Sequence, residues 1–381
     1  MVKFVRFTKI LAINILILSV IALFFELVLQ LVAAFRPSYS VLFLEPDSRV
    51  GWKMVPNYNW TWAGNHWYAN AFSVDVKSNS LGFRGGEIHE KKPVGAIRVA
   101  MLGDSFVEAI QVPLDRTSSK LIQSIMGGLD GENTWEVLNF GVSNYGVGQY
   151  LLLWENYVKD YSPDYVVFII SDLQMGRSLS EYRAGSFGST KGKLLSIRPV
   201  YRLDEDGSKQ LYPQKDYEQF VSLQKQLIDS SFAGNRSKRK DNGLISPGYF
   251  NSIRLRIESK LSGQKTKSQP LSISKISREE ILRVNYLIMK DLALQVTSSG
   301  AKLIMLDASR HFGDPISTTN FLEKASEDLG IHYVPVYKKL IGSDALGRPT
   351  TFHTDGHYNE IGNMIIAEQA AGKIKELLNA N

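Results

Sequence analysis

The apolar and polar positions of this chain change their spacing several times, and the changes predict a series of short strands. The segment around Val99–Leu102 is a continuous apolar run that Gly103 interrupts. A later run of six apolar residues is long enough for a strand buried on both faces of a sheet. The expected strands are Ile97–Gly103, Trp135–Phe140, Tyr165–Ile170, Lys302–Leu306 and Ile331–Pro335.

Helical spacing occupies the segments between these strands. One helix has a clear start, because Ser277 is followed by Glu280 in the pattern of a capping box, and Gly300 marks its end. Strands that alternate with helices predict an α/β fold with a doubly wound, mostly parallel, five-stranded sheet of the flavodoxin-like type. The expected helices are Ser118–Met126, about Gln149–Tyr161, Ser277–Ser299, Thr319–Leu329 and Glu360–Leu378.

The segment Ile10–Phe35 is almost wholly apolar. As a helix it would be about 39 Å long, against about 30 Å for the hydrocarbon core of a bilayer. A cleaved signal peptide has a shorter apolar region. Lys3, Arg6 and Lys9 precede the segment and only Arg36 follows closely, which favours a cytoplasmic N-terminus. We therefore expect an uncleaved, single-pass anchor in the inner or plasma membrane, with the C-terminal domain extracytoplasmic (periplasmic).

Three parts follow from this pattern. Residues 1–36 form the cytoplasmic N-terminus and anchor, 37–96 form an aromatic-rich extension, and 97–381 form the α/β domain. Within that domain the regular pattern is lost at about 178–274, which indicates an insertion. Its two basic stretches, Arg236–Lys240 and Gly263–Lys267, favour a solvated loop, with attraction to anionic lipid or an acidic polysaccharide as the alternative.

The extension contains four tryptophans. The alternation in Asn59–Trp62 predicts short strands or a hairpin. The rings could stack on sugars or lie at a membrane surface. Packing of the rings on the main domain is the favoured interpretation. The four are Trp52, Trp60, Trp62 and Trp67.

Composition narrows the chemistry. The chain has 381 residues, of which 44% are hydrophobic and 22% charged, as in a globular protein. It has no cysteine, which excludes disulfides and thiolate metal sites. Nothing in the sequence resembles a nucleic-acid-binding motif, so a nucleic-acid partner is not expected.

Ser105 follows the first expected strand of the sheet. A serine at the carboxyl end of a parallel strand can point into the crevice where open α/β sheets hold ligands. The N–H groups at the start of a following helix could bind a developing anion. Ser105 is therefore a candidate nucleophile, provided that a base arrives from elsewhere. On the triplet Gly103–Ser105 alone, an ordinary turn with Asp104 or Ser105 as a helix cap is the favoured alternative.

The other end of the chain changes that balance. Asp355 and His357 lie in the segment Thr354–Gly362, just before the last expected helix. With Gly-Asp-Ser early and Asp-x-His late, the chain resembles the SGNH (GDSL-type) hydrolase family, from roughly Gly51 to the C-terminus with a gap in the middle. The resemblance implies that Ser105 attacks an acyl carbonyl, His357 is the base and Asp355 orients it.

This chain differs from the family's usual pattern in the position of the acid and in two residues of the oxyanion hole. The family places the acid three residues before the histidine, where this chain has Thr354. The shorter Asp-x-His spacing is similar to that of related acetyltransferases that decorate secreted polysaccharides. The resemblance also implies an oxyanion hole made by Ser105, by Asn144 where the family has glycine, and by Ser171 where it has asparagine. Loss of one such donor typically lowers the rate by about 10²–10³.

His353, Asp355 and His357 alternate, so a metal site is an alternative interpretation. The pairing with Ser105 explains the last two residues better, and we expect no metal and no cofactor.

The sequence thus predicts a membrane-anchored extracytoplasmic serine esterase or O-acyltransferase. Its substrate would be an acylated glycan, of the envelope or secreted, or another ester. A membrane protein that donates the acyl (acetyl) group is a candidate partner for the transfer reaction. The alternative is a non-catalytic SGNH-fold subunit for binding or assembly in an envelope polysaccharide complex.

Overall fold

The structure is a computed structural model. It divides the chain into two compact units, Met1–Tyr39 with Ser231–Gln269, and Ser40–Ser230 with Pro270–Asn381. Helix α1 (Val2–Ala34) belongs to the first unit. In the part of the chain that the structure describes, no helix is long and apolar enough to cross a membrane, so the transmembrane helix expected over 10–35 is not found there. The described residues are 2–34, 43–66, 69–129, 134–180, 182–183, 196–213, 218, 276–353 and 355–380.

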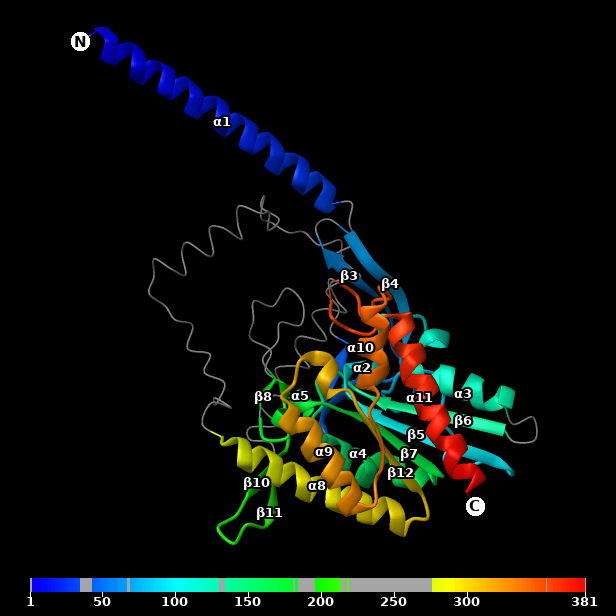
Figure 1. Cartoon of the computed structure of the whole chain (residues 1–381). Helices are drawn as coiled ribbons and strands as arrows, with labels where there is room; N and C mark the ends of the chain where they lie inside the picture. Colours follow the sequence, from blue (N-terminus) through cyan, green and yellow to red (C-terminus); the bar gives the residue numbers. More distant parts are fainter. Residues whose placement is uncertain are drawn as a thin grey trace. The chain divides into compact units, whose positions relative to one another are not determined.

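The second unit is built on a five-stranded sheet in the order β13-β12-β7-β5-β6 (Figure 1). Each neighbouring pair runs parallel. This confirms the α/β fold with a parallel central sheet. The strands are β5 (Ala96–Gly103), β6 (Thr134–Gly141), β7 (Tyr165–Ile170), β12 (Lys302–Asp307) and β13 (His332–Val334).

Helices cover both faces of this sheet (Figure 1). Successive residues of a strand point to opposite faces, and on β5 Ala100 and Leu102 join one buried cluster while Val99 and Met101 join the other. The first cluster includes side chains of α4 (Val147–Leu153), α8 (Arg278–Ser298) and α9 (Ile316–Leu329), and the second those of α3 (Ser118–Leu129), α10 (Tyr337–Ala345) and α11 (Glu360–Asn379).

The helices differ from the expectation in several places, and the short helix α5 (Asp172–Arg177), for example, was not expected. The segment after β6 is not one regular helix, because α4 continues as a π-helical turn over Trp154–Val158 and a 3₁₀ turn over Lys159–Tyr161. Helix α10 was not expected from the sequence. Its one fully buried residue is Leu340, so it has no apolar stripe from which a helix could be read.

The N-terminal extension forms two antiparallel hairpins, which confirms the expected hairpin at Asn59–Trp62. Trp52 and Trp60 are buried, and Trp60 stacks on Phe43 with 5.0 Å between ring centroids. Trp52 lies against Tyr145 with 5.7 Å between ring centroids, which confirms packing on the main domain for this ring. The stacking partner of Trp60 lies within the extension itself, and Trp67 lies outside the described residues. The strands are β1 (Leu44–Asp47), β2 (Gly51–Met54), β3 (Asn59–His66) and β4 (Ala69–Lys77).

The insertion contains regular structure that the sequence did not predict. Strands β10 (Val200–Leu203) and β11 (Lys209–Tyr212) form an antiparallel hairpin, and β8 (Tyr182–Arg183) pairs with β9 (Ser196–Ile197). The sequence indicated only that the regular pattern is lost here, because strands of two to four residues are too short to show a periodic pattern. The two basic stretches lie outside the described residues.

Candidate active site

Ser105 lies where the sequence placed it, at the carboxyl end of β5 and at the first position of the short helix α2 (Ser105–Glu108). Asp104 is the N-cap of this helix, and its carboxylate accepts a hydrogen bond of 3.0 Å from the backbone N–H of Phe106. The capping interpretation is thus true of Asp104. It does not compete with a chemical role for Ser105, whose own N–H lies at a helix position that has no partner within the helix.

The end of β6 lies directly against α2. Gly141 makes this possible, since a Cβ there would be 2.3 Å from the backbone nitrogen of Glu108. One residue later, the N–H of Val142 donates a 3.1 Å hydrogen bond to the carbonyl of Gly103. The loops that leave β5 and β6 therefore run side by side, and they bring the segment of Asn144 next to that of Ser105.

His357 and Asp355 reach Ser105 from the loop before α11, although 252 residues separate His357 from the serine. His357 Nε2 lies 2.9 Å from Ser105 Oγ, and His357 Nδ1 lies 2.8 Å from Asp355 Oδ1. The backbone of Gly356, between the acid and the base, has a φ of 75°, which is a left-handed conformation that suits glycine. This turn lets an acid only two residues before the histidine reach its ring.

The surroundings of His357 raise its pKa above the ordinary value of 6.5. Burial alone disfavours the charged imidazolium and lowers the pKa. The hydrogen bond and the negative charge of Asp355, together with the charges of Asp104 and Glu108, outweigh burial. The site therefore stabilises a protonated imidazole, which is the form that a general base reaches after it has taken a proton.

Aromatic side chains pack around the base. Phe106, the residue after the serine, stacks on Phe312 at 4.8 Å and lies 5.7 Å from the ring of His357. Tyr358 is buried against Phe106, and His311 stacks on Tyr358 at 5.6 Å. Of these rings Phe106 lies beside the imidazole, and the others pack against Phe106 and one another. The side chain of His357 is still 27% exposed.

The loop after β6 contains Asn144, the expected oxyanion donor. Its φ of 68° places it in the left-handed region, which asparagine tolerates better than most residues. Asn144 therefore adopts the conformation that glycine would adopt, and its backbone N–H remains the candidate donor.

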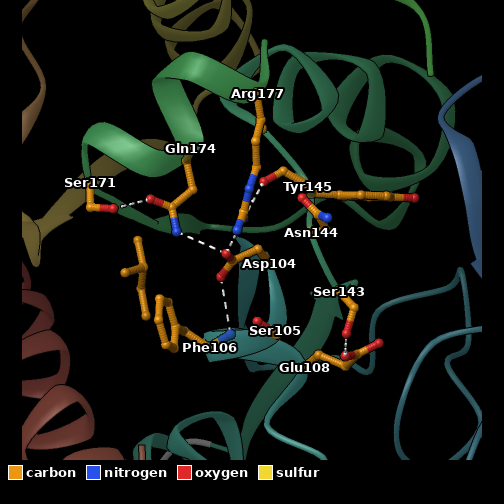
Figure 2. A network of polar contacts seen from close by, with 12 residues as sticks. Asp104, Ser105, Phe106, Glu108, Ser143, Asn144, Tyr145, Ser171, Gln174 and Arg177 are labelled. Carbon is orange, nitrogen blue, oxygen red and sulfur yellow. Dashed lines mark hydrogen bonds and ion pairs between the residues drawn. The ribbon is translucent and has the colours of Figure 1, made fainter. Parts of the chain in front are cut away.

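The structure places Ser171 differently from the expectation. Its hydroxyl donates to the amide oxygen of Gln174, and the amide nitrogen of Gln174 donates to Asp104 Oδ2 at 2.9 Å (Figure 2). Ser171 and Gln174 are both buried. Because a hydroxyl has a single proton, donation from Ser171 to an oxyanion would require this contact to break. The Ser171 hydroxyl is a support for Asp104 in this structure and not a free donor.

Arg177 joins the two loops beside the serine, a role that no spacing in the sequence indicated. Its Nη1 atom is 2.6 Å from Asp104 Oδ2 and 3.2 Å from the carbonyl oxygen of Tyr145 (Figure 2). Asp104 is 1% exposed, so Arg177 and Gln174 supply the partners that a buried carboxylate needs.

The metal alternative for His353, Asp355 and His357 finds no support in the structure. Among the described residues, no group of three or more histidine, cysteine, aspartate or glutamate side chains could hold a metal ion.

Comparison with known proteins found no family model that matches the sequence and no curated protein that matches it. Several solved structures are similar to 73–74% of the chain. An acetyl xylan esterase has a TM-score of 0.39 at 12% identity, with 100% of its own chain covered. A GDSL-like lipase from Parabacteroides merdae has 0.38 at 10% identity with 98% covered, and a lipase/acylhydrolase from Enterococcus faecalis has 0.39 at 9% identity with 96% covered.

Proposed function

We propose that this protein is a serine esterase or O-acyltransferase that forms an acyl-enzyme on Ser105. One observation carries the proposal: Ser105 Oγ, His357 and Asp355 form a continuous chain of hydrogen bonds, of 2.9 Å and 2.8 Å. A nucleophile, a base and a group that orients the base, each within hydrogen-bond reach of the next, are the parts that acyl transfer requires.

In the first half of the reaction, Ser105 Oγ attacks the carbonyl carbon of an ester while His357 Nε2 takes the hydroxyl proton. Asp355 holds Nδ1 and stabilises the imidazolium. The carbonyl oxygen becomes an oxyanion, which the backbone N–H groups of Ser105 and Asn144 would bind. Collapse of the tetrahedral intermediate breaks the bond to the leaving alcohol, which receives the proton from His357, and an acyl-Ser105 ester remains.

In the second half, an acceptor attacks the acyl-enzyme. His357 removes a proton from the acceptor and returns it to Ser105 Oγ when the ester bond breaks. With water as the acceptor the protein is an esterase, and with a sugar hydroxyl it is an O-acyltransferase that would need an acyl-donor partner. We propose ester-linked acyl (acetyl) groups of an envelope or secreted glycan as the substrate, on the strength of the Asp-x-His spacing at Asp355–His357.

We further propose that α1 attaches the protein to the inner or plasma membrane, with the α/β domain on the extracytoplasmic (periplasmic) side. Consecutive apolar side chains of α1, Ile15–Leu18, are all exposed, so every face of the helix is apolar there. Protease added to spheroplasts should digest the domain, and protection of the domain would contradict this orientation.

A non-catalytic binding or assembly subunit is the second candidate. The observation that favours it is the engagement of Ser171 by Gln174, which leaves one expected oxyanion donor occupied. The two candidates differ in whether Ser105 reacts.

The test uses the detergent-purified full chain and a fluorophosphonate probe, with an aryl acetate as substrate. We expect labelling and turnover in the native protein, and neither in Ser105→Ala. Because His357 must be neutral to act as a base, the rates of labelling and of turnover should both rise as the pH increases through the pKa of His357. A native protein that neither labels nor turns over esters at any pH would favour the non-catalytic candidate.

A further inference from the structure

Three consecutive carbonyls in the loop after β6 each accept a hydrogen bond from a side chain outside that loop. Trp52 Nε1 donates to Ser143 at 3.0 Å, Arg198 Nη1 donates to Asn144 at 2.8 Å, and Arg177 Nη1 donates to Tyr145 at 3.2 Å. We call Ser143–Tyr145 the oxyanion loop. Its central residue is the candidate donor Asn144.

The donors come from separate parts of the chain. Arg177 ends α5 (Asp172–Arg177), Trp52 lies on β2 of the N-terminal extension, and Arg198 lies between β9 and β10 of the insertion. Trp52 and Arg198 are almost completely buried, and the Arg198 guanidinium lies over the Trp52 ring at 4.8 Å from its centroid. The extension and the insertion thus meet each other directly behind the oxyanion loop.

Gln149, on the following helix, completes the arrangement. Its Oε1 atom accepts from the N–H of Gly146 at 3.1 Å and from Arg198 Nη1 at 3.0 Å. A side chain on Gly146 would have backbone and side-chain atoms of α5 within 2.9 Å, so the loop is confined on that side as well. Arg198 therefore binds the carbonyl of Asn144 directly, and it also binds the Gln149 side chain that accepts from the N–H of Gly146.

This support answers two physical needs of the loop. A left-handed conformation costs a residue other than glycine about 1–2 kcal/mol, so Asn144 stays in it only where neighbouring contacts favour it. In addition, the Ser143 carbonyl and the Asn144 N–H belong to one peptide unit. A hydrogen bond to that carbonyl polarises the unit and makes its N–H a stronger donor. Trp52 therefore acts on the peptide unit whose N–H would face the oxyanion.

We infer that Trp52 and Arg198 are positioning residues that fix the N–H of Asn144 for the oxyanion, and that this is a catalytic purpose of the extension and the insertion. The inference rests on the proposed acyl transfer at Ser105. Neither residue touches the reacting atoms, so their removal should lower kcat and leave KM nearly unchanged, because an oxyanion exists only in the transition state and intermediate.

Trp52→Phe tests the indole N–H and keeps an aromatic ring in place. The matched control is Trp60→Phe, because Trp60 is also buried in the extension but its Nε1 has no hydrogen-bond partner among the described residues. We expect Trp52→Phe to lower kcat on an aryl acetate and the rate of Ser105 phosphonylation by about tenfold. Trp60→Phe should change both by less than twofold.

Arg198→Lys tests the second contact, with Arg202→Lys as its control. Arg202, on β10, donates to the carbonyl of Leu179 and not to the oxyanion loop. We expect a several-fold fall in kcat for Arg198→Lys alone, and we expect thermal melting to show that both variants are folded. The inference would be overturned if Ser105 is labelled in the native protein but the Trp52→Phe and Arg198→Lys variants have the same kcat as their controls. If Trp52→Phe does not fold, the arginine pair decides the question. Absence of labelling in the wild type would instead contradict the proposed function.

Discussion

The two halves of the candidate site are built in different ways. Ser105 is the first residue of α2, directly after β5, and His357 and Asp355 lie in the loop before α11. His357 contacts Ser105 at 2.9 Å and Asp355 at 2.8 Å. The oxyanion loop instead depends on side chains from outside the core sheet, among them Trp52 and Arg198. The core sheet and the segments next to its strands therefore position the reacting groups. The geometry of the proposed anion site depends instead on the N-terminal extension and the insertion.

The largest expected loss of kcat comes from variants of Ser105, His357 and Asp355. His357→Ala removes the base, so kcat on an aryl acetate should fall almost to the uncatalysed level. The double variant with Ser105→Ala should be little worse than either single variant, because triad members act as a unit. Multiplicative losses in the double variant would contradict the shared role.

Asp355→Asn should be milder and should show a distinct pH signature. In the native protein the hydrogen bond and the charge of Asp355 raise the pKa of His357 against the effect of burial, so loss of that charge should lower the pKa. The neutral imidazole is the active base, so the acidic limb of the kcat/KM profile should move to lower pH while the plateau falls. An unmoved limb would mean that Asp355 does not act through His357.

Arg177 connects the two halves, so its loss should destabilise the fold. Arg177→Gln leaves the carboxylate of Asp104 buried without its cation, which typically costs about 3 kcal/mol. Denaturant unfolding should show this loss. The control is Lys373→Gln, which breaks a surface pair with Glu376 and should change the free energy of unfolding by less than about 1 kcal/mol. Equal losses in both variants would contradict a supporting role for Arg177.

The smallest effects should come from two of the three expected oxyanion positions, Asn144 and Ser171. Asn144→Gly keeps the backbone N–H and the left-handed conformation, so kcat should stay within about twofold. Ser171→Ala breaks the contact with Gln174 behind Asp104 but removes no direct donor, so it should lower kcat only a few-fold. A loss of 10²–10³ in Ser171→Ala would instead identify its hydroxyl as a donor to the oxyanion.

The sequence predicted the sheet because buried strands leave a local signal, whereas it grouped Ser105, Asp355 and His357 through the resemblance of their motifs to a known family. Continuous apolar runs such as Tyr165–Ile170 mark buried strands, and serine, aspartate and histidine are informative residue types at turns. Several elements left no such signal, among them α10 with its single buried Leu340 and the short hairpin at β10 and β11.

The support of the oxyanion loop could not be predicted for a different reason. Trp52, Arg177 and Arg198 all donate to backbone carbonyls, and every residue has a carbonyl. No residue type or spacing marks which carbonyl will be the acceptor. Ser171 illustrates the same limit, since its partner Gln174 is three residues away and became evident only from the structure.

The central claim is that Ser105 becomes covalently acylated with His357 as its base. The direct measurement is mass spectrometry of peptides from the full chain after a rapid quench with a slowly hydrolysed aryl ester. We expect the acyl mass on the peptide that contains Ser105, at a level that rises with pH through the pKa of His357 and is lost in His357→Ala. An unmodified Ser105 during measurable turnover, or equal acylation in His357→Ala, would contradict the account.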